Sequence, residues 1–461
     1  MTGPGSTAEL DLTETGTIDL RAATQTKSSA RVVVADDRRF MRLSLLGSQV
    51  GTTISEADCA VVEAGFRTAR DQGLPVIGHL SAAGPNIAEG LAPSVAWSRI
   101  AREMVRSSGI VPILFVADGP VLSGPSFLLG LADVVVFTTD AYAYLSGPRM
   151  VRDFTGTEIS GPELGGAGAH QRSSGLAAAV VETPAEGEDY LLEVLSYLPN
   201  HVDELSPVLP SEDPLDRPTP EAGEFLPDTP TGSYDVRDII SSVADDGHFT
   251  ELRAQWAPNI VVGFASMGGH PIGIVANQTQ SMAGSIDIAA SQKGARFVGF
   301  CDAFNIPLLT IVDTSGFLPG KDLEWRGMIR HGAQLAFAYA RATVPRIGLI
   351  VRKSYGGAYI VMDSVNMGND VMFAWPTAEV AVMGAKGAVE ILHRGASEAE
   401  KAELVAEYES TYLTPYPAAE RGSITAVIEP EQTRRKVIAA LQMLSSKREK
   451  LRPRRHDNMP L

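Results

Sequence analysis

The sequence predicts an α/β fold made of two copies of one unit, in which helices flank a parallel or mixed sheet. In the second half, Leu308–Val312 and Ile347–Val351 are continuous apolar runs, which are typical of strands buried on both faces. Each run ends at a glycine-containing turn, and helix-compatible sequence follows. Strand, turn and helix therefore alternate, as expected for parallel strands joined by helical crossovers.

The first half repeats this pattern, which indicates a duplication. A predicted strand opens with an apolar residue and a proline at four places: Leu74-Pro75, Val111-Pro112, Ile306-Pro307 and Val344-Pro345. The spacing within the first pair nearly equals the spacing within the second. Gly124 and Gly357 then follow at matching distances. Repetition over such a long period is the sign of a duplicated domain.

The other elements of the first half follow from apolar patterns and end signals. Ser55 is a suitable N-cap for a helix over Glu56–Gln72, and Gly73 ends that helix. Pro93–Ser108 is the second predicted helix. The predicted strands are Arg31–Ala35, Phe40–Leu46, Pro75–His79, Val111–Ala117, Val134–Phe137 and Ala141–Leu145.

The second half shows a hairpin, a long helix and then the two central strands. Gly268-Gly269 predicts a turn between strands Ile260–Ser266 and Pro271–Ala276, and a helix is expected over Ser285–Phe304. The remaining predicted elements are a strand over Glu379–Met383 and helices over Val236–Ala244, Tyr359–Met367, Gly387–His393, Ser397–Glu409 and Pro430–Lys447.

Composition limits the classes of function. The chain has 461 residues, of which 44% are hydrophobic and 20% charged, as is ordinary for a globular protein of two or three domains. Its net charge of −16 argues against general binding to nucleic acid. Only Cys59 and Cys301 are present, which favours a reducing compartment. The sequence shows neither a signal peptide nor an apolar run long enough to span a membrane, so we expect a cytoplasmic protein.

Four segments are expected along the chain. Residues 1–30 lack periodicity and are interpreted as a mobile extension. Residues 31–200 form the first domain. Residues 201–234 are rich in proline and acids and are interpreted as a linker or a draped arm. Residues 235–461 form the second domain.

A turn in the second half carries the main chemical signal. Ser354-Tyr355-Gly356-Gly357-Ala358 lies between a buried strand and a helix, and its two glycines leave backbone N–H groups uncovered. Such groups suit a carbonyl oxygen that becomes anionic during a reaction. An ordinary tight turn would explain the two glycines equally well, so the motif alone leaves both interpretations open.

Longer motifs carry a resemblance to a known family. They include YDVRDII, GIVANQTQ, KGARFVGFCDAFNIPLLTIVDTSGFLPG, RHGAQLAFAYARATVPRIGLIVRKSYGGAYIVM and FAWPTAEVAVMGAKGAV between about Tyr234 and Ala388. In the first half they include GLPVIGHLSAAGPNIAEG, GLADVVVFT and LGGAGAHQRSSGLA. Together these stretches resemble the carboxyltransferase (beta) subunit of biotin-dependent acyl-CoA carboxylases of the acetyl- or propionyl-CoA type. The tail RRHDNMPL is similar to the end of that family, so a complete chain is expected.

The resemblance implies a fold, an activity and partners. The fold would be two tandem crotonase-like domains, and the activity would be transfer of a carboxyl group from carboxybiotin to the α carbon of an acyl-CoA, in fatty acid or polyketide precursor metabolism. The chain has no phosphate-binding GxxxxGK[ST] loop and no Ala-Met-Lys-Met-like biotinylation site. A partner would therefore supply ATP use and the biotin. Members of the family form rings of six, so a homo-hexamer or a hetero-hexamer with a paralogue is expected, with no metal, nucleic acid or membrane involved.

The resemblance also implies site residues. The oxyanion hole for biotin would lie at Gly356, Gly357 and Ala358, and the hole for the acyl-CoA at Ser123 and Gly124. Substrate would be contacted by Ser81, Ala82, Ala83, Gly84, Phe127, Tyr359 and Ile360. No side-chain base is expected, because the family uses the biotin nitrogen that decarboxylation releases.

The first half departs from the family at these positions. Ser81-Ala82-Ala83-Gly84-Pro85 stands where the family has Ser-Gly-Gly-Ala-Arg, and Leu122-Ser123-Gly124-Pro125 stands where it has Ala-Gly-Gly-Ala. Pro125 has no N–H to donate. Two alternatives therefore stay open: a decarboxylase of malonyl-type thioesters, and a non-catalytic subunit of a carboxylase complex.

Other polar residues are weaker candidates for a functional role. Asp313 stands at a strand end, where an aspartate more often caps a turn than takes part in catalysis. His331 and His393 suit structural or surface roles. Arg352 and Lys353 are candidates to contact CoA phosphates, although solvated charges are the simpler interpretation.

Overall fold

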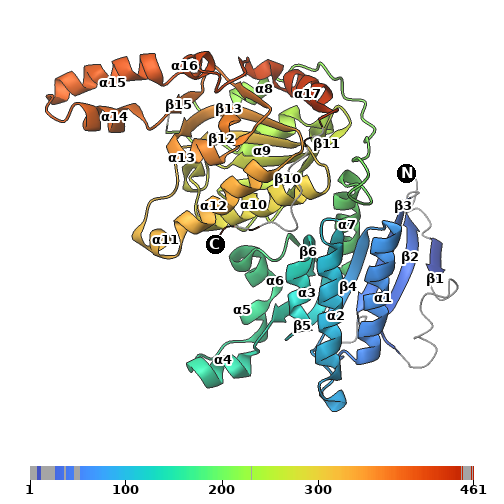
Figure 1. Cartoon of the computed structure of the whole chain (residues 1–461). Helices are drawn as coiled ribbons and strands as arrows, with labels where there is room; N and C mark the ends of the chain where they lie inside the picture. The colour runs from blue at the N-terminus through green and yellow to red at the C-terminus, as the bar shows by residue number, and fades with distance from the viewer. Residues whose placement is uncertain are drawn as a thin grey trace. The chain divides into compact units, whose positions relative to one another are not determined.

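A computed structural model describes residues 8–11, 26–35, 38–45, 52–229, 231–447, 449, 458 and 460 of the chain. The chain divides into two compact units, unit 1 (Met1–Leu205) and unit 2 (Ser206–Leu461). Each unit contains one eight-stranded sheet with helices packed against it (Figure 1).

The sheet of unit 1 is mixed and runs in the order β1-β2-β3-β4-β5-β6-β8, with β7 paired to β5. Strands β1, β2 and β3 pair antiparallel, and every later pair is parallel. The strands are β1 (Ala8–Asp11), β2 (Ser29–Ala35), β3 (Arg38–Leu45), β4 (Val76–Ala82), β5 (Ile113–Leu122), β6 (Val134–Thr138), β7 (Tyr142–Tyr144) and β8 (Ala179–Val181).

The helices of unit 1 confirm the end signals in the sequence. Helix α1 (Glu56–Gln72) begins with a capping box, in which Ser55 accepts the N–H of Asp58 and the Asp58 side chain accepts the N–H of Ser55. It ends at Gly73, whose φ of 63° suits glycine. The other main helices are α2 (Ala92–Ser107), α3 (Ser126–Leu131), α4 (Pro148–Thr155), α5 (Gly161–Gly165) and α7 (Pro184–Tyr197).

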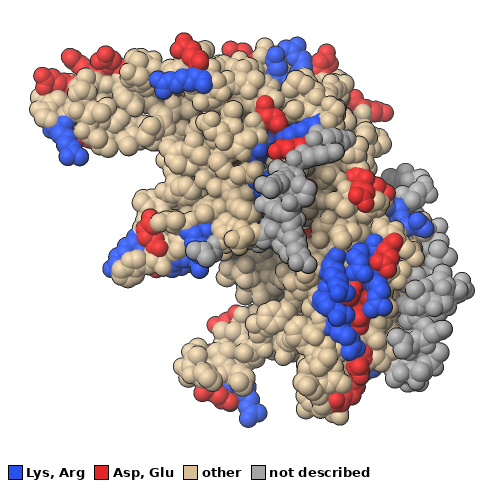
Figure 2. All heavy atoms as spheres, viewed as in Figure 1, with Lys and Arg blue, Asp and Glu red and all other residues tan. Residues whose placement is uncertain are grey.

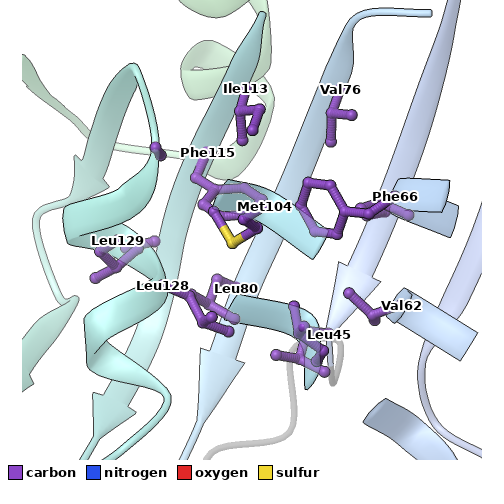
Figure 3. Packing of buried hydrophobic residues seen from close by; sticks show 14 of the residues in the cluster. Leu45, Val62, Phe66, Val76, Leu80, Met104, Ile113, Phe115, Leu128 and Leu129 are labelled. Carbon is purple, nitrogen blue, oxygen red and sulfur yellow. The ribbon is translucent and has the colours of Figure 1, made fainter. Parts of the chain in front are cut away.

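Helices α1, α2 and α3 bury one face of this sheet. Phe66 of α1 meets Phe115 of β5 edge to face, with ring centroids 6.3 Å apart. Met104 of α2 and Leu128 of α3 point into the same layer (Figure 3). Burying a side chain of this kind stabilises the fold by roughly 1.5–3 kcal/mol. The apolar runs that predicted the strands thus form this core.

The outer surface of α1 and α2 carries a cluster of arginines, visible in Figure 2 as a blue patch interrupted by red. Two glutamates pair with these arginines: Glu63 with Arg67 and Arg99 at 3.1 Å each, and Glu103 with Arg70 at 2.7 Å and Arg106 at 2.8 Å. The patch is therefore a network of ion pairs on two neighbouring helices, and not an unpaired basic surface.

Unit 2 repeats the sheet of unit 1 strand for strand. Its order is β16-β14-β13-β12-β11-β10-β9, with β15 paired to β13, and the three strands β9 to β11 pair antiparallel. The strands are β9 (Thr250–Leu252), β10 (Ile260–Met267), β11 (His270–Asn277), β12 (Leu308–Thr314), β13 (Arg346–Tyr355), β14 (Val371–Ala374), β15 (Glu379–Ala381) and β16 (Ala426–Val427). The predicted duplication is thus confirmed.

Both units share one irregularity at the ends of their two central strands. In unit 2, Val312 pairs with Ile350, but the next pair is Thr314 with Ser354. In unit 1, Leu80 pairs with Ala117, and the next pair is Ala82 with Val121. Strands β13 and β5 thus each carry two extra residues, which form a bulge.

Helices pack on both faces of the second sheet. Helices α10 (Ile288–Ala303) and α12 (Met328–Arg341) lie side by side on one face, where Phe297 and Phe300 pack against Phe264 of β10. Helices α9 (Val236–Val243) and α17 (Thr433–Leu444) share a second core cluster with the sheet. The remaining helices are α8 (Glu221–Glu224), α11 (Lys321–Trp325), α13 (Gly356–Val361), α14 (Ala385–Leu392), α15 (Glu398–Tyr412) and α16 (Pro415–Glu420).

The proline-rich segment packs along unit 2 as a draped arm. The Leu209 N–H donates to Gly269 at 2.8 Å, and the Thr219 N–H donates to Glu431 at 3.0 Å. Ala222 and Tyr234 are buried in the core. Prolines make this segment stiff. Its path along unit 2 is fixed by these hydrogen bonds and by its buried side chains.

Several predicted boundaries were wrong. Strand β4 continues to Ala82 and β5 to Leu122, past the ends of their apolar runs. No separate turn follows β13, because α13 begins directly at Gly356. This helix ends at Val361, so the predicted helix over Tyr359–Met367 is broken, and a 3-10 turn covers Val365–Met367. The expected extension includes strand β1, while residues 1–7 and 12–25 lie outside the described residues.

The cap of α1 gives a test of this packing. Ser55→Ala should lower the free energy of unfolding by about 1 kcal/mol, because the Asp58 N–H loses its acceptor at the start of a helix that packs into the core. Ser397→Ala breaks the same type of capping box in α15, which has no buried residues. This control should leave the main transition unchanged. Urea unfolding followed by circular dichroism measures the free energy of unfolding of both variants. Equal losses of stability would contradict the conclusion that α1 is packed into the core and α15 is not.

Candidate functional site

The Gly356-Gly357-Ala358 stretch forms the first turn of α13. Gly356 has a φ of 55°, a left-handed conformation that lets the chain pass directly from strand to helix. The N–H groups of Gly357 and Ala358 have no partner within the helix, as is general for a first turn. No other described residue accepts them. Two adjacent backbone donors are therefore available here.

The surroundings of Gly357 leave its N–H accessible, whereas Ala358 is buried. Gly357 itself is exposed. A Cβ added to it would meet only one atom within 4 Å, Cε2 of Phe317 at 3.8 Å. Gly356 differs, because its added Cβ would lie 2.9 Å from the carbonyl oxygen of Val382. Gly356 is thus needed for the backbone path, whereas Gly357 keeps the surface above the donors bare.

Ser123, Gly124 and Pro125 occupy the corresponding positions of unit 1, because Val121 and Ser354 are equivalent in the two bulges. Ser123 has a φ of 61°, close to that of Gly356. Its N–H, however, already donates to the carbonyl oxygen of Tyr144 at 2.9 Å. Ser123 therefore has no available N–H for the acyl-CoA hole that the resemblance implies at Ser123 and Gly124. Pro125 has no N–H. Of these three residues, only Gly124 has an N–H group for which no described residue is the acceptor.

An aromatic pair that sequence reasoning missed stands beside Gly124. A Cβ added to Gly124 would lie 2.5 Å from Nε1 of Trp97 on α2, so the indole packs directly against the glycine. The same indole stacks on Phe127, with ring centroids 6.2 Å apart and an interplanar angle of 14°. Phe127 is half exposed. In the sequence, Trp97 was an ordinary helix residue, and nothing there marked its proximity to Gly124.

The expected substrate loop of unit 1 is mostly buried. Ser81 and Ala82 belong to β4, and their exposed fractions are 4% and 0%. The Ala83 N–H donates to Thr52 at 2.8 Å, and the Gly84 carbonyl accepts the Ile54 N–H at 2.9 Å. Ala83 is only partly exposed, and Gly84 is buried. The four residues thus complete a strand end and do not form an open loop.

Tyr359 and Ile360 of α13 differ in exposure. Tyr359 is buried, and its hydroxyl donates to the carbonyl oxygen of Ser423 at 3.3 Å. Ile360 is exposed, and it occupies the position that corresponds to Phe127 in unit 1. Of this pair, Ile360 is the one whose side chain can reach a ligand.

Two charged candidates form a buried pair. Nε of Arg352 lies 2.9 Å from Oδ2 of Asp313, and both side chains are less than a tenth exposed. Arg352 is therefore not available for a phosphate. His331 lies 3.2 Å from Gln292, and His393 is exposed. Among the described residues, no group of three His, Cys, Asp or Glu side chains could hold a metal ion. None of the described helices is both long and apolar enough for a membrane crossing.

A polar cluster that the sequence did not reveal lies in unit 1, where β4, β5 and α7 each contribute one side chain. His79 of β4 has its Nε2 3.1 Å from Glu188 and its Nδ1 3.6 Å from Asp118. Burial alone would lower the pKa of His79, but hydrogen bonds to Asp118 and Glu188 outweigh burial and raise the pKa to about 9. His79 is therefore an imidazolium at neutral pH, shielded between two carboxylates.

Known proteins resemble this chain over nearly its whole length. The carboxyl transferase domain family matches residues 29–459. The propionyl-CoA carboxylase carboxyltransferase subunit of Haloferax mediterranei is 43% identical over 426 residues, which is 91% of this chain and 82% of that protein. The methylmalonyl-CoA decarboxylase subunit alpha of Veillonella parvula is 39% identical, and the match covers 89% of this chain and 81% of that subunit.

A solved structure shares the fold. The transcarboxylase 12S hexamer with methylmalonyl-coenzyme A and methylmalonic acid bound matches with a TM-score of 0.93 at 35% identity. The match covers 99% of this chain and 90% of that chain.

His79 gives a pH-dependent prediction. Its pKa in the folded state, about 9, lies above its ordinary value of 6.5, so the charged ring stabilises the fold fully below pH 6.5. This contribution, roughly 1–3 kcal/mol, should be lost as pH rises through 9. His79→Gln removes the titrating group and should flatten the profile between pH 6.5 and 9.5. Urea unfolding across that range measures the slope, and identical profiles for both proteins would contradict the prediction.

Proposed function

This chain belongs to the carboxyl transferase family, and we propose that it is the carboxyltransferase subunit of a biotin-dependent acyl-CoA carboxylase. Its activity is that of a carboxyltransferase of the propionyl-CoA carboxylase type, which moves a carboxyl group between biotin and an acyl-CoA. The observation that carries the assignment of the site is the pair of adjacent N–H donors at Gly357 and Ala358, whose hydrogen bonds no described residue accepts.

The biotin side of the reaction is assigned to unit 2, within residues 235–461. Carboxybiotin supplies the carboxyl group, and negative charge develops on the urea oxygen as that group leaves. The N–H groups of Gly357 and Ala358 are suited to stabilise this charge, because they lie in the first turn of α13 and no described residue accepts their hydrogen bonds. The bare surface over Gly357 leaves room for a flat ring to approach.

The acyl-CoA side is assigned to unit 1, within residues 31–200. The thioester oxygen becomes an enolate oxygen when the α carbon loses its proton, so it needs donors of its own. The Ser123 turn offers one N–H, that of Gly124, beside the Trp97–Phe127 pair. We propose that this half binds an acyl-CoA with altered selectivity, because aromatic bulk favours an apolar acyl group over a small polar one.

One observation favours a second candidate function. Decarboxylation of an already carboxylated thioester generates the same enolate without removal of an α proton, so the single Gly124 donor suits this reaction as well as carboxyl transfer. A relative of this chain carries the name methylmalonyl-CoA decarboxylase subunit alpha. The alternative is therefore a decarboxylase of malonyl-type thioesters, and a non-catalytic subunit is the remaining possibility.

Assembly into a hexamer is also part of the proposal. The transcarboxylase 12S relative is a hexamer. In this chain, large exposed apolar side chains lie near the start of α2, at Leu91 and Val95, and near the start of α12, at Trp325 and Ile329. Such surfaces suit burial against further subunits. We propose that a separate biotin carboxylase and biotin carrier chain completes the enzyme in the cytoplasm.

Reconstitution tests the function. The purified chain is mixed with a biotinylated carboxylase partner, ATP, labelled bicarbonate and acetyl-, propionyl- or butyryl-CoA. We expect label to enter an acyl-CoA, and more of it with the larger acyl groups. Pro125→Ala adds a second donor and should raise the rate. Activity that appears only in this variant would identify the natural chain as a non-catalytic subunit. Biotin-independent loss of CO₂ from methylmalonyl-CoA would support the decarboxylase instead.

The biotin-side donors can be tested separately. Ala358→Pro deletes one N–H, and the fold should tolerate it, because Pro125 holds the corresponding position in unit 1. We expect carboxyl transfer to fall about 10²–10³-fold, as is typical for loss of one oxyanion donor. Ala358→Ser keeps the N–H and serves as the control. Unchanged transfer in a folded Ala358→Pro variant would show that the donors lie elsewhere.

A further inference from the structure

The bulge that separates β12 from β13 contains a carboxylate. Asp313 falls between the last regular pair, Val312 with Ile350, and the next pair, Thr314 with Ser354. Its Oδ1 accepts the N–H of Lys353 at 3.1 Å. Lys353 lies three residues before Gly356, so this bond holds the segment from which the donor pair is presented.

Two other side chains donate hydrogen bonds to the Asp313 carboxylate. Nε of Arg352 and the hydroxyl of Tyr234 both donate to Oδ2 of Asp313, each at 2.9 Å. The guanidinium lies 5.4 Å from the centre of the Tyr234 ring, and its Nη1 donates to the carbonyl oxygen of Gly232 at 2.9 Å. Burial raises the pKa of Asp313, and Arg352, the Lys353 N–H and Tyr234 oppose this effect. The bulge is thus locked by a desolvated polar network.

Unit 1 shows what the same bulge looks like without this network. Ser81 takes the place of Asp313, and Gly119 takes the place of Arg352. A Cβ added to Gly119 would lie 2.6 Å from Oγ of Ser81, so no larger side chain fits there. The backbone therefore forms this bulge without an Asp–Arg pair, and the carboxylate that the bulge of β5 contains, Asp118, faces His79 at 3.6 Å instead. The network accompanies only the unit whose turn has two available donors.

We infer that Asp313 is a positioning residue for the Gly357–Ala358 donor pair, and that Arg352 and Tyr234 fix its carboxylate. The inference rests on the proposed function, since it assigns Asp313 to the biotin side. Asp313 is buried, so we assign it an indirect role. It acts through the Lys353 N–H, which fixes the end of β13 three residues before α13 begins at Gly356. The segment before α9 takes part, because it supplies Tyr234 and Gly232.

The test uses the full chain in its assembled form. Asp313→Ser combined with Arg352→Gly gives unit 2 the pair that unit 1 already accommodates, so the fold should persist. Tyr234→Phe removes one hydrogen bond and keeps the ion pair. The control, Arg237→Gln with Glu251→Gln, removes another ion pair of unit 2, with a 2.6 Å contact. Free biotin serves as acceptor and methylmalonyl-CoA as donor, and amide hydrogen exchange is followed over residues 353–361.

The double variant should lower kcat/KM for biotin at least tenfold and leave KM for methylmalonyl-CoA within twofold of the natural value. The Lys353 amide should exchange faster in that variant. Tyr234→Phe should show smaller changes in the same direction, and the control should show neither. A folded double variant with natural values of both measurements would overturn the inference.

Two further outcomes have defined meanings. If the natural chain transfers nothing to biotin, the proposed function fails. Amide exchange then decides the inference alone: faster exchange in the double variant supports positioning, and unchanged exchange overturns it. If the double variant does not fold, Tyr234→Phe decides by the same two measurements.

Discussion

The bulge between the two central parallel strands is the constraint on which the rest of each unit depends. A parallel pair in perfect register would carry β12 and β13 side by side to their ends, and the backbone N–H groups that face the partner strand would be used in the ladder. Instead, β13 gains two residues relative to β12. Its end is released from the ladder, passes through the left-handed Gly356 and enters α13 at once. Two N–H groups are available because the strand leaves its partner at this point.

The two units have the same backbone path, but they differ in which backbone N–H groups are available after the bulge. Ser123 adopts nearly the conformation of Gly356, yet its N–H is satisfied by Tyr144, and Pro125 removes the next donor. Trp97 then packs on the one glycine that keeps its N–H. The fold is thus conserved between the units at the level of pairing, while the chemistry differs at single positions. A common bulge with different donors suits an enzyme that must bind two different oxygens.

The buried charges follow the same division. Unit 2 places Asp313 and Arg352 in its bulge, and unit 1 places Ser81 and Gly119 there. The bulge of β5 in unit 1 also contains Asp118, which faces His79, and Glu188 lies against the other ring nitrogen of His79. A buried ion pair contributes little net stability, because desolvation cancels much of its attraction. The larger effect of such a pair is that it fixes the positions of the groups around it. Near a reacting atom, a displacement of about 1 Å can greatly lower the rate of reaction.

Much of the fold could be predicted from local sequence. Apolar runs opened by prolines predicted the duplicated α/β architecture, and Ser55 and Gly73 predicted the ends of α1. The long motifs between about Tyr234 and Ala388 indicated the family, and the resemblance implied a donor site at Gly356-Gly357-Ala358. These features depend on backbone propensity and on residues close together in the chain. Strand ends were predicted less well, because β4 and β5 continue past their apolar runs into the bulge.

Contacts between distant residues were decided only by the tertiary structure. Ser123 lost its N–H to Tyr144 because β7 pairs with the end of β5. Trp97 meets Gly124 because α2 packs beside α3. Tyr234 reaches Asp313 from 79 residues away because the arm is draped over unit 2. The sequence by itself determined which groups could donate and which could carry charge. Only strand register and helix packing, which depend on the whole chain at once, decided which donors were left without a partner.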